Sequence, residues 1–225
     1  MDIDHIVLAA ADLECAKAEF AAATGVTPVD GGPHPGGGTC NALVSFGNGC
    51  YLEIIAPDPK QSLAGTNGER FAAYTETQLL HWAVRCDDLE ATALWLKDRG
   101  ARPTAIRDMA RDAPNGQQLR WRLMGVRAPG LDGLMPFFID WQDTPHPAAT
   151  APSVGALRSI GIGLSQANPC ENALLEVVKG LDAGRTNVRM GGSESTNEGA
   201  GMKVEFESPR GLQVYESATL AGFGF

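Results

Sequence analysis

The apolar and polar positions of the chain follow one order that occurs three times. In the first copy, an apolar run at 4–10 precedes a segment, 13–24, whose apolar residues fall at helical spacing. Two further apolar runs flank a Gly-Asn-Gly turn, which is the pattern of a β-hairpin. Together with a short extended piece at 26–29, this order predicts a β-α-β-β-β module over residues 1–60.

A second copy repeats the first at an offset of 76 residues. The stretch DHIVLAAADLE near the N-terminus matches LHWAVRCDDLE further along, so that His5 corresponds to His81. Asp12 and Asp88 follow the two apolar runs at equivalent places and are predicted to cap the helices that come next. The Asp and Leu of the repeat therefore serve folding, whereas the repeated histidine calls for another explanation.

The third copy is fainter and carries Ser159 at the histidine position. Because repeated units of this kind bury their apolar faces against one another, we predict an α+β fold with repeated β-α-β-β-β modules that form curled mixed sheets around a cleft. The predicted parts are a paired domain at 1–145 with modules 1–60 and 78–143 joined by 61–77, a Pro-rich linker at 144–153, and a third, divergent module at 154–225.

Composition narrows the classes of function. The 225 residues are 44% hydrophobic and carry a net charge of -9, so phosphate neutralisation has no obvious source and nucleic acid or an acidic membrane surface is not an expected partner. The five cysteines are scattered and odd in number, which favours reduced thiols over a disulfide framework. The N-terminus resembles neither a signal peptide nor a membrane span, and we expect a cytoplasmic protein.

Three residues are candidate metal ligands. His5 and His81 lie at equivalent places of two first strands, and Glu53 is a carboxylate within an otherwise apolar strand, where a charge is costly unless it is paired or bound to a cation. Ordinary roles remain open: a hydrogen-bonded core or surface histidine, and a Glu that points to water. Two imidazoles and one carboxylate suit Zn, Ni, Mn, Co or Fe(II), with positions left open for substrate.

Further polar residues are candidates for the wall of the cleft. Asn41 lies on a first-module strand, and Arg120 and Arg122 share one face of a second-module strand, where they could clamp a carboxylate or phosphate. Their exposure on a solvated face, or pairing with acidic residues, is an equal alternative. His34 lies in the stretch DGGPHPGGGT, predicted to be irregular, and His146 in the linker; both are expected at the surface.

The stretches DHIVLAAADLE, NALVSFGNGCYLEIIAP and LHWAVR resemble the glyoxalase-like members of the vicinal oxygen chelate superfamily over roughly residues 2–145. The resemblance implies metal ligands from the first and last strands of each module, here His5, Glu53 and His81. The fourth position falls in PFFIDW, where Phe138 stands opposite Glu53 and Asp140 follows on the same face. Unless Asp140 reaches in, the resemblance implies a three-ligand site with Glu53 as the catalytic base.

The leading hypothesis is a divalent-metal enzyme that acts on a small carbonyl or vicinal-oxygen substrate by lyase, isomerase or dioxygenase chemistry, with Arg120 or Arg122 as substrate anchor. The alternative is a metal-free binding protein of the bleomycin-resistance type, whose cleft holds a ligand against Tyr51, Trp82 and Phe138. The third module is a candidate for covering a sheet or for forming a homodimer.

Overall fold

The computed structural model describes residues 1–112, 116, 118–131, 133–164, 170–181, 187–191 and 201–217. The helices and strands of the first module are β1 (Asp2–Ala9), α1 (Leu13–Thr24), β2 (Val29–His34), β3 (Thr39–Gly47) and β4 (Cys50–Pro57), followed by the short helix α2 (Asn67–Phe71). Those of the second are β5 (Gln78–Arg85), α3 (Leu89–Lys97), β6 (Arg102–Pro103), β7 (Arg107–Asp112), β8 (Gln118–Met124), β9 (Val126–Arg127) and β10 (Phe137–Asp140). The rest comprises η1 (Pro147–Ala149), β11 (Leu157–Gly163), α4 (Glu171–Gly180), β12 (Asn187–Gly191), β13 (Gly201–Ser208) and β14 (Gly211–Ser217).

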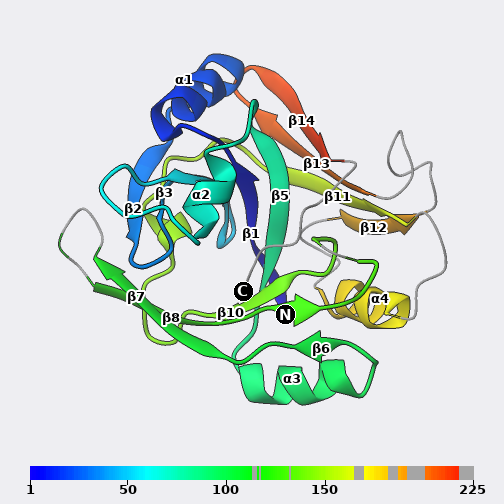
Figure 1. Cartoon of the computed structure of the whole chain (residues 1–225). Helices are drawn as coiled ribbons and strands as arrows, with labels where there is room; N and C mark the ends of the chain where they lie inside the picture. The colour runs from blue at the N-terminus through cyan, green and yellow to red at the C-terminus, as the bar shows by residue number, and fades with distance from the viewer. Residues whose placement is uncertain are drawn as a thin grey trace.

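The two modules form one 8-stranded sheet in the order β2-β3-β4-β1-β5-β10-β8-β7. The first strands β1 and β5 are antiparallel neighbours at its centre, and each also pairs in parallel with the last strand of its own module, β4 or β10. The edge strands β2 and β7 approach each other, so the sheet curls until it is nearly closed (Figure 1). The predicted α+β class and the predicted curled sheet are thus confirmed.

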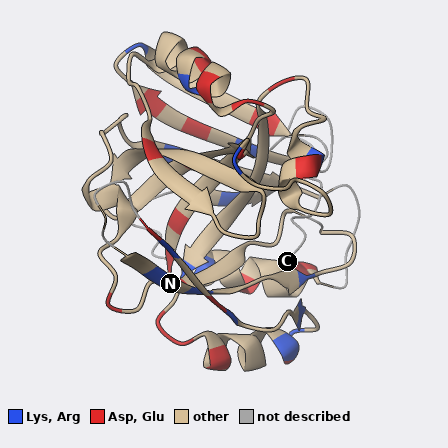
Figure 2. Ribbon diagram, turned by 60° about the vertical axis from the view of Figure 1, so that its left-hand side comes forward, with Lys and Arg blue, Asp and Glu red and all other residues tan. Residues whose placement is uncertain are grey.

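Both module helices begin where the sequence predicted. The side chain of Asp12 accepts a hydrogen bond from the backbone N–H of Cys15, and that of Asp88 accepts one from Ala91, each at 2.8 Å. Helix α3 also places Glu90 in its first turn and Lys97 in its last, in line with the helix dipole (Figure 2).

Strand β2 corrects the prediction that DGGPHPGGGT is irregular. Residues 30–34 of that stretch pair with β3, from Asp30 opposite Ala42 to His34 opposite Thr39. A strand with two glycines and a proline is tolerated because β2 lies at the edge of the sheet, where one side needs no ladder hydrogen bonds. The pairing carries His34 along the sheet instead of leaving it in a surface loop.

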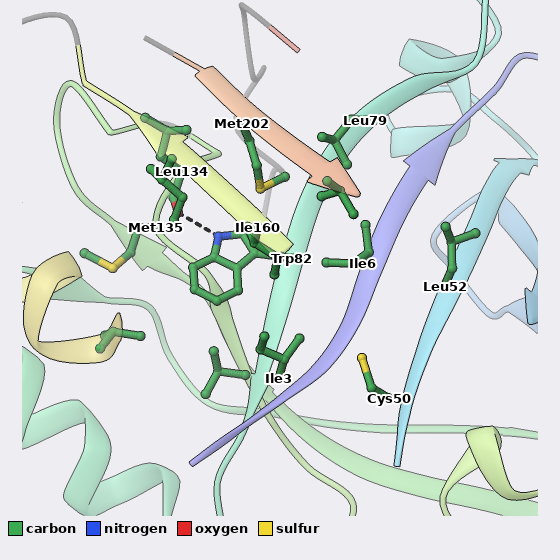
Figure 3. Close-up of a cluster of buried hydrophobic side chains, with 14 of the residues drawn as sticks. Ile3, Ile6, Cys50, Leu52, Leu79, Trp82, Leu134, Met135, Ile160 and Met202 are labelled. Carbon is green, nitrogen blue, oxygen red and sulfur yellow. Dashed lines mark hydrogen bonds between the residues drawn. The ribbon is translucent and has the colours of Figure 1, made fainter. Parts of the chain in front are cut away.

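Two hydrophobic clusters lie on the two faces of the curled sheet. The larger one covers the outer face, where Ile6, Leu52 and Trp82 belong to the same cluster as Ile160 of β11 and Met202 of β13 (Figure 3). The indole N–H of Trp82 donates to the carbonyl of Leu134 at 2.7 Å, which satisfies a polar group within this core. The smaller cluster lies inside the curl, and the candidate site is built against it.

The described strands of the predicted third module form a separate 4-stranded sheet in the order β12-β11-β13-β14. The first of these strands, β11, pairs in parallel with β12, the second, whereas β1 and β5 pair in parallel with the last strand of their modules. The segment at 144–153 packs on β3, with the N–H of Ser45 donating to Pro152 at 2.8 Å. The predicted division into domains stays a prediction, and part of 154–225 lies outside the described residues.

In the part of the chain that the structure describes, none of the helices combines the length and the hydropathy needed to cross a membrane.

Candidate functional site

A pocket of about 360 Å³ opens on the inner face of the curled sheet. Polar side chains from β1, β2, β3, β4 and β7 line one part of its wall: His5, His34, Asn41, Glu53, Arg107 and Arg111. Apolar side chains from β7, β8, β10 and the residue after β10 line much of the remainder: Met109, Trp121, Leu123, Phe137, Ile139 and Trp141. A mostly apolar cavity with a few convergent polar groups is typical of a small-molecule site.

Glu53 lies at the meeting point of the polar side chains and is only 8% exposed. Its Oε1 accepts a hydrogen bond of 2.5 Å from the amide of Asn41 and lies 3.6 Å from Nε2 of His34. Its Oε2 lies 3.7 Å from Nε2 of His5. A buried carboxylate with one hydrogen-bonded oxygen and two nearby imidazoles is a suitable proton acceptor.

The buried carboxylate of Asp4 fixes the orientation of His5. One oxygen lies 2.6 Å from Nδ1 of His5, and the other accepts from Nε1 of Trp141 and Nε2 of His146, both at 3.0 Å. Burial by itself would raise the pKa of Asp4, but the hydrogen bonds from His146 and His5 outweigh it and hold the pKa at about 2. Because an ionised carboxylate only accepts hydrogen bonds, Nδ1 of His5 carries a proton that points to Asp4, and Nε2 is the ring nitrogen that lies toward Glu53.

Asp4 escaped the sequence analysis because neighbouring residues of a regular strand point to opposite faces. The ladder between β1 and β5 shifts register between Ile3 and His5, and this irregularity lets Asp4 and His5 touch on one side. His146 was wrongly expected at the surface for a related reason, since the segment after β10 folds back onto β1. An acidic residue inside an apolar strand was the signal that could have revealed Asp4.

His34 is likewise not a surface residue. Its Nδ1 lies 2.9 Å from Oγ1 of Thr39, and its Nε2 lies 3.2 Å from the amide nitrogen of Asn41. Burial lowers the pKa of His34, which favours the neutral ring. The neutral ring then donates from Nδ1 to Thr39 and accepts from Asn41, so it helps to hold the amide against Glu53.

His81 lies on β5 next to β1, and its ring centroid is 5.3 Å from that of Phe137 in the pocket wall. Its Nδ1 is 2.9 Å from the carbonyl oxygen of Trp82 and 3.0 Å from the backbone nitrogen of the same residue. Within the described ranges, no three His, Cys, Asp or Glu side chains are grouped so that they could hold a metal ion. The structure brings His5 and Glu53 together on the neighbouring strands β1 and β4, and metal binding by His5, Glu53 and His81 stays a prediction.

His81 should make the protein acid-sensitive. Burial lowers its pKa from 6.5 to about 4, so the unfolded chain takes up a proton near pH 6.5 whereas the folded protein does so near pH 4. Above pH 6.5 the protonation of His81 therefore does not affect the free energy of unfolding. As the pH falls from 6.5 to 4, this free energy decreases by about 3 kcal/mol, because only the unfolded chain takes up the proton. We expect the unfolding free energy of a His81→Gln variant, measured in urea at several pH values, to fall less over this window; an equal fall in both proteins would contradict the assignment.

Several predicted binding residues point out of the pocket. Phe138 is fully buried in the outer cluster, whereas its neighbours Phe137 and Ile139 line the pocket, so the predicted alignment with Glu53 was wrong by one residue. Asp140 shares the outward face with Phe138, and its side chain accepts from the N–H of Gln142 at 2.8 Å. Trp82 belongs to the outer cluster as well.

The predicted arginine anchors face outward too. Arg120 donates to Gln118, and Arg122 pairs with Glu90 and lies 3.6 Å from Asp108. Their strand β8 instead directs Trp121 and Leu123 into the pocket. Arg107 and Arg111 of the neighbouring strand β7 are the arginines of the pocket wall, and the sequence analysis named neither of them.

Four predicted residues do lie on the pocket wall: His5, Asn41, Tyr51 and Glu53. The ring of Tyr51 stacks on His5 with centroids 4.5 Å apart, and burial raises the pKa of its hydroxyl well above the usual value, so the hydroxyl stays protonated. Their position is a structural fact, whereas their roles in binding or catalysis stay predictions.

Comparison with known proteins identifies one family and several solved structures that match this chain. Residues 3–178 match the model of the glyoxalase-like domain. A hypothetical protein from Staphylococcus aureus has 14% identity and a TM-score of 0.67, over 96% of this chain and 98% of that one. Methylmalonyl-CoA epimerase from Mycobacterium tuberculosis has 21% identity and a TM-score of 0.45, over 66% of this chain and 92% of its own. No curated protein matches the sequence.

Proposed function

The chain belongs to the glyoxalase-like domain family, and from this premise we propose that it is an enzyme that moves a proton at a carbon atom next to a carbonyl group of a small molecule. The observation that carries the proposal is the position of Glu53, a buried carboxylate in the wall of the pocket, with its Oε2 3.7 Å from Nε2 of His5. Isomerase and lyase chemistry both begin with such a proton transfer.

In the proposed step, the carboxylate of Glu53 takes the proton from the carbon atom. The electron pair of the broken C–H bond moves toward the carbonyl carbon and gives an enolate, and the proton returns to the same or the neighbouring carbon atom. Asn41 holds Oε1 of Glu53, which directs the other oxygen toward His5. His5 is the second proton carrier, because ionised Asp4 stabilises the imidazolium that forms when Nε2 accepts a proton.

A divalent metal is the part of the expected chemistry that the donor set fits poorly. His5 and Glu53 could both reach one ion, but among the described residues no third acidic, histidine or cysteine side chain is grouped with them so that it could complete a metal site. We therefore assign the proton transfer to Glu53 and His5 themselves. Zn, Ni, Mn, Co or Fe stays a prediction that the experiment below addresses.

The experiment is deuterium incorporation from D₂O, followed by proton NMR, into phenylpyruvate and 4-phenyl-2-butanone, which present an enolisable carbon atom with and without a carboxylate. We expect the protein to accelerate exchange at this carbon for at least one compound, and to do so after dialysis against EDTA. Exchange that EDTA abolishes and added Zn restores would overturn the metal-free assignment.

The second candidate is a binding protein without catalytic activity, which the aromatic side chains of Trp121, Phe137 and Trp141 in the pocket wall favour. Such a protein would show ligand-dependent quenching of tryptophan fluorescence with the same two compounds. Quenching without faster exchange for either compound would contradict the enzyme and support this alternative.

A further inference from the structure

Arg111 is a buried cation for which the described residues supply no hydrogen-bond or ion-pair partner. It lies on β7 with its side chain in the pocket wall and is 5% exposed. Within the described part of the chain its guanidinium makes no hydrogen bond or ion pair, and Nη1 is a buried donor that is left unsatisfied. Because a buried charge is costly unless it is paired, this arrangement indicates that a ligand supplies the missing anion.

The opposite edge of the sheet leaves room for this guanidinium. Gly31 and Gly32 of β2 face Arg111: a Cβ atom at Gly32 would lie 2.8 Å from Nη1, and one at Gly31 would lie 3.2 Å from Nη2. Gly32 also has a φ of +124°, a conformation that residues with side chains rarely adopt. The two glycines therefore admit the guanidinium between β2 and β7 and limit its movement.

We infer that Arg111 binds a carboxylate group of the substrate, and that the substrate is a small carbonyl compound with one carboxylate and an apolar body. The inference rests on the proposed function for the carbonyl group and on Arg111 for the carboxylate. Arg107 lies on the same face of β7 at an exposed position of the pocket wall, where its charge attracts an incoming anion.

The charges and the lining of the pocket favour a single carboxylate. The negative charge of Glu53 acts on Arg111. Arg111 neutralises one carboxylate of a ligand, whereas Glu53 would repel a second negative charge on the same ligand. The planar guanidinium matches a carboxylate with two parallel hydrogen bonds. The apolar side chains of Trp121, Leu123 and Phe137 leave the remainder of the ligand in an apolar environment.

The test is binding of 3-phenylpropionate, its neutral amide 3-phenylpropionamide and benzyl phosphate, measured by calorimetry. We expect the acid to bind the protein about tenfold or more tightly than the amide, since a hydrogen bond to a charged group contributes about that factor. Arg111→Gln should remove this preference and leave the Kd of the amide within about twofold. Arg120→Gln is the matched control, because Arg120 faces out of the pocket, and it should bind like the unmodified protein.

The following outcomes would contradict the inference. Equal binding of acid and amide, an unchanged Kd in Arg111→Gln, or tighter binding of benzyl phosphate than of the acid would overturn it. Without ligand, Arg111→Gln should melt no lower than the unmodified protein, because it removes an unpaired buried charge; a lower Tm would show a purely structural arginine. If that variant does not fold, Arg111→Lys keeps the charge without the planar fork, and an unchanged Kd for the acid would overturn the inference.

Glu53→Gln separates this inference from the proposed function. It should bind 3-phenylpropionate at least as tightly as the unmodified protein, because it removes a nearby negative charge from the pocket. Failure of proton exchange with carboxylate binding at Arg111 intact would therefore reject the catalytic proposal alone. Intact exchange with no effect of Arg111→Gln on binding would reject the carboxylate site alone.

Discussion

Glu53→Gln should lower the rate of catalysed deuterium exchange by about 10²–10⁴-fold, the range that a positioned general base contributes. The amide of Gln has nearly the same shape as the carboxylate but cannot accept a proton from carbon. It can still accept a hydrogen bond from Asn41 through its oxygen, so the network around the residue keeps its main contact. The measurement is the NMR exchange rate per mole of folded protein.

Asp140→Asn is the control for the Glu53 variant. Asp140 is a carboxylate that the sequence predicted for the site, yet it lies on the outward face of β10 and accepts from the N–H of Gln142, as an Asn side chain also can. Its exchange rate should match that of the unmodified protein. Equal exchange by Glu53→Gln and the unmodified protein would remove Glu53 from the mechanism.

Asp4→Ala should lower the unfolding free energy by about 3–5 kcal/mol, the cost of removing one member of a buried charged network. The side chain is fully buried, and its loss leaves Nδ1 of His5, Nε1 of Trp141 and Nε2 of His146 without their acceptor. Urea unfolding at neutral pH measures the effect. A loss below about 1 kcal/mol, as at an exposed ion pair, would contradict the central place of Asp4.

Asp2→Ala is the matched control, since Asp2 lies on the same strand and forms a partly exposed pair with Arg85 at 3.4 Å. Its expected cost is below about 1 kcal/mol.

The contribution of Asp4 also has a pH signature. Since hydrogen bonds hold its pKa at about 2 against an ordinary 3.8, its stabilising effect is complete above pH 3.8 and is lost as the pH falls toward 2.

The repeat and the order of helices and strands along each copy were predictable because they depend on patterns within short stretches of sequence. Apolar runs, the caps Asp12 and Asp88 and the Gly-Asn-Gly turn are all signals within a few residues, and each corresponds to an observed element. Asn41, Tyr51 and Glu53, which were predicted from the alternation of faces, lie on the pocket wall because β3 and β4 are long strands; their roles stay predictions.

The errors occur where register depends on distant contacts. Phe138 was placed in the site by counting within a strand of four residues, and a shift of one residue exchanges the two faces. Arg111 could not be found because its importance comes from β2, which meets β7 only when the sheet curls. Asp4 needed the register shift in β1, and His146 needed the segment after β10 to fold back.

The pairing of the two modules about β1 and β5 has a consequence for how the protein can change. The first copy supplies Asp4, His5 and Glu53, the proposed acid–base groups, whereas the second supplies Arg111 and much of the apolar wall. Duplication has thus produced two halves with the same architecture and different duties. Under the proposed function, substitutions on β7, β8 and β10 would alter which molecule is accepted while the proposed proton-transfer groups, on other strands, stay in place.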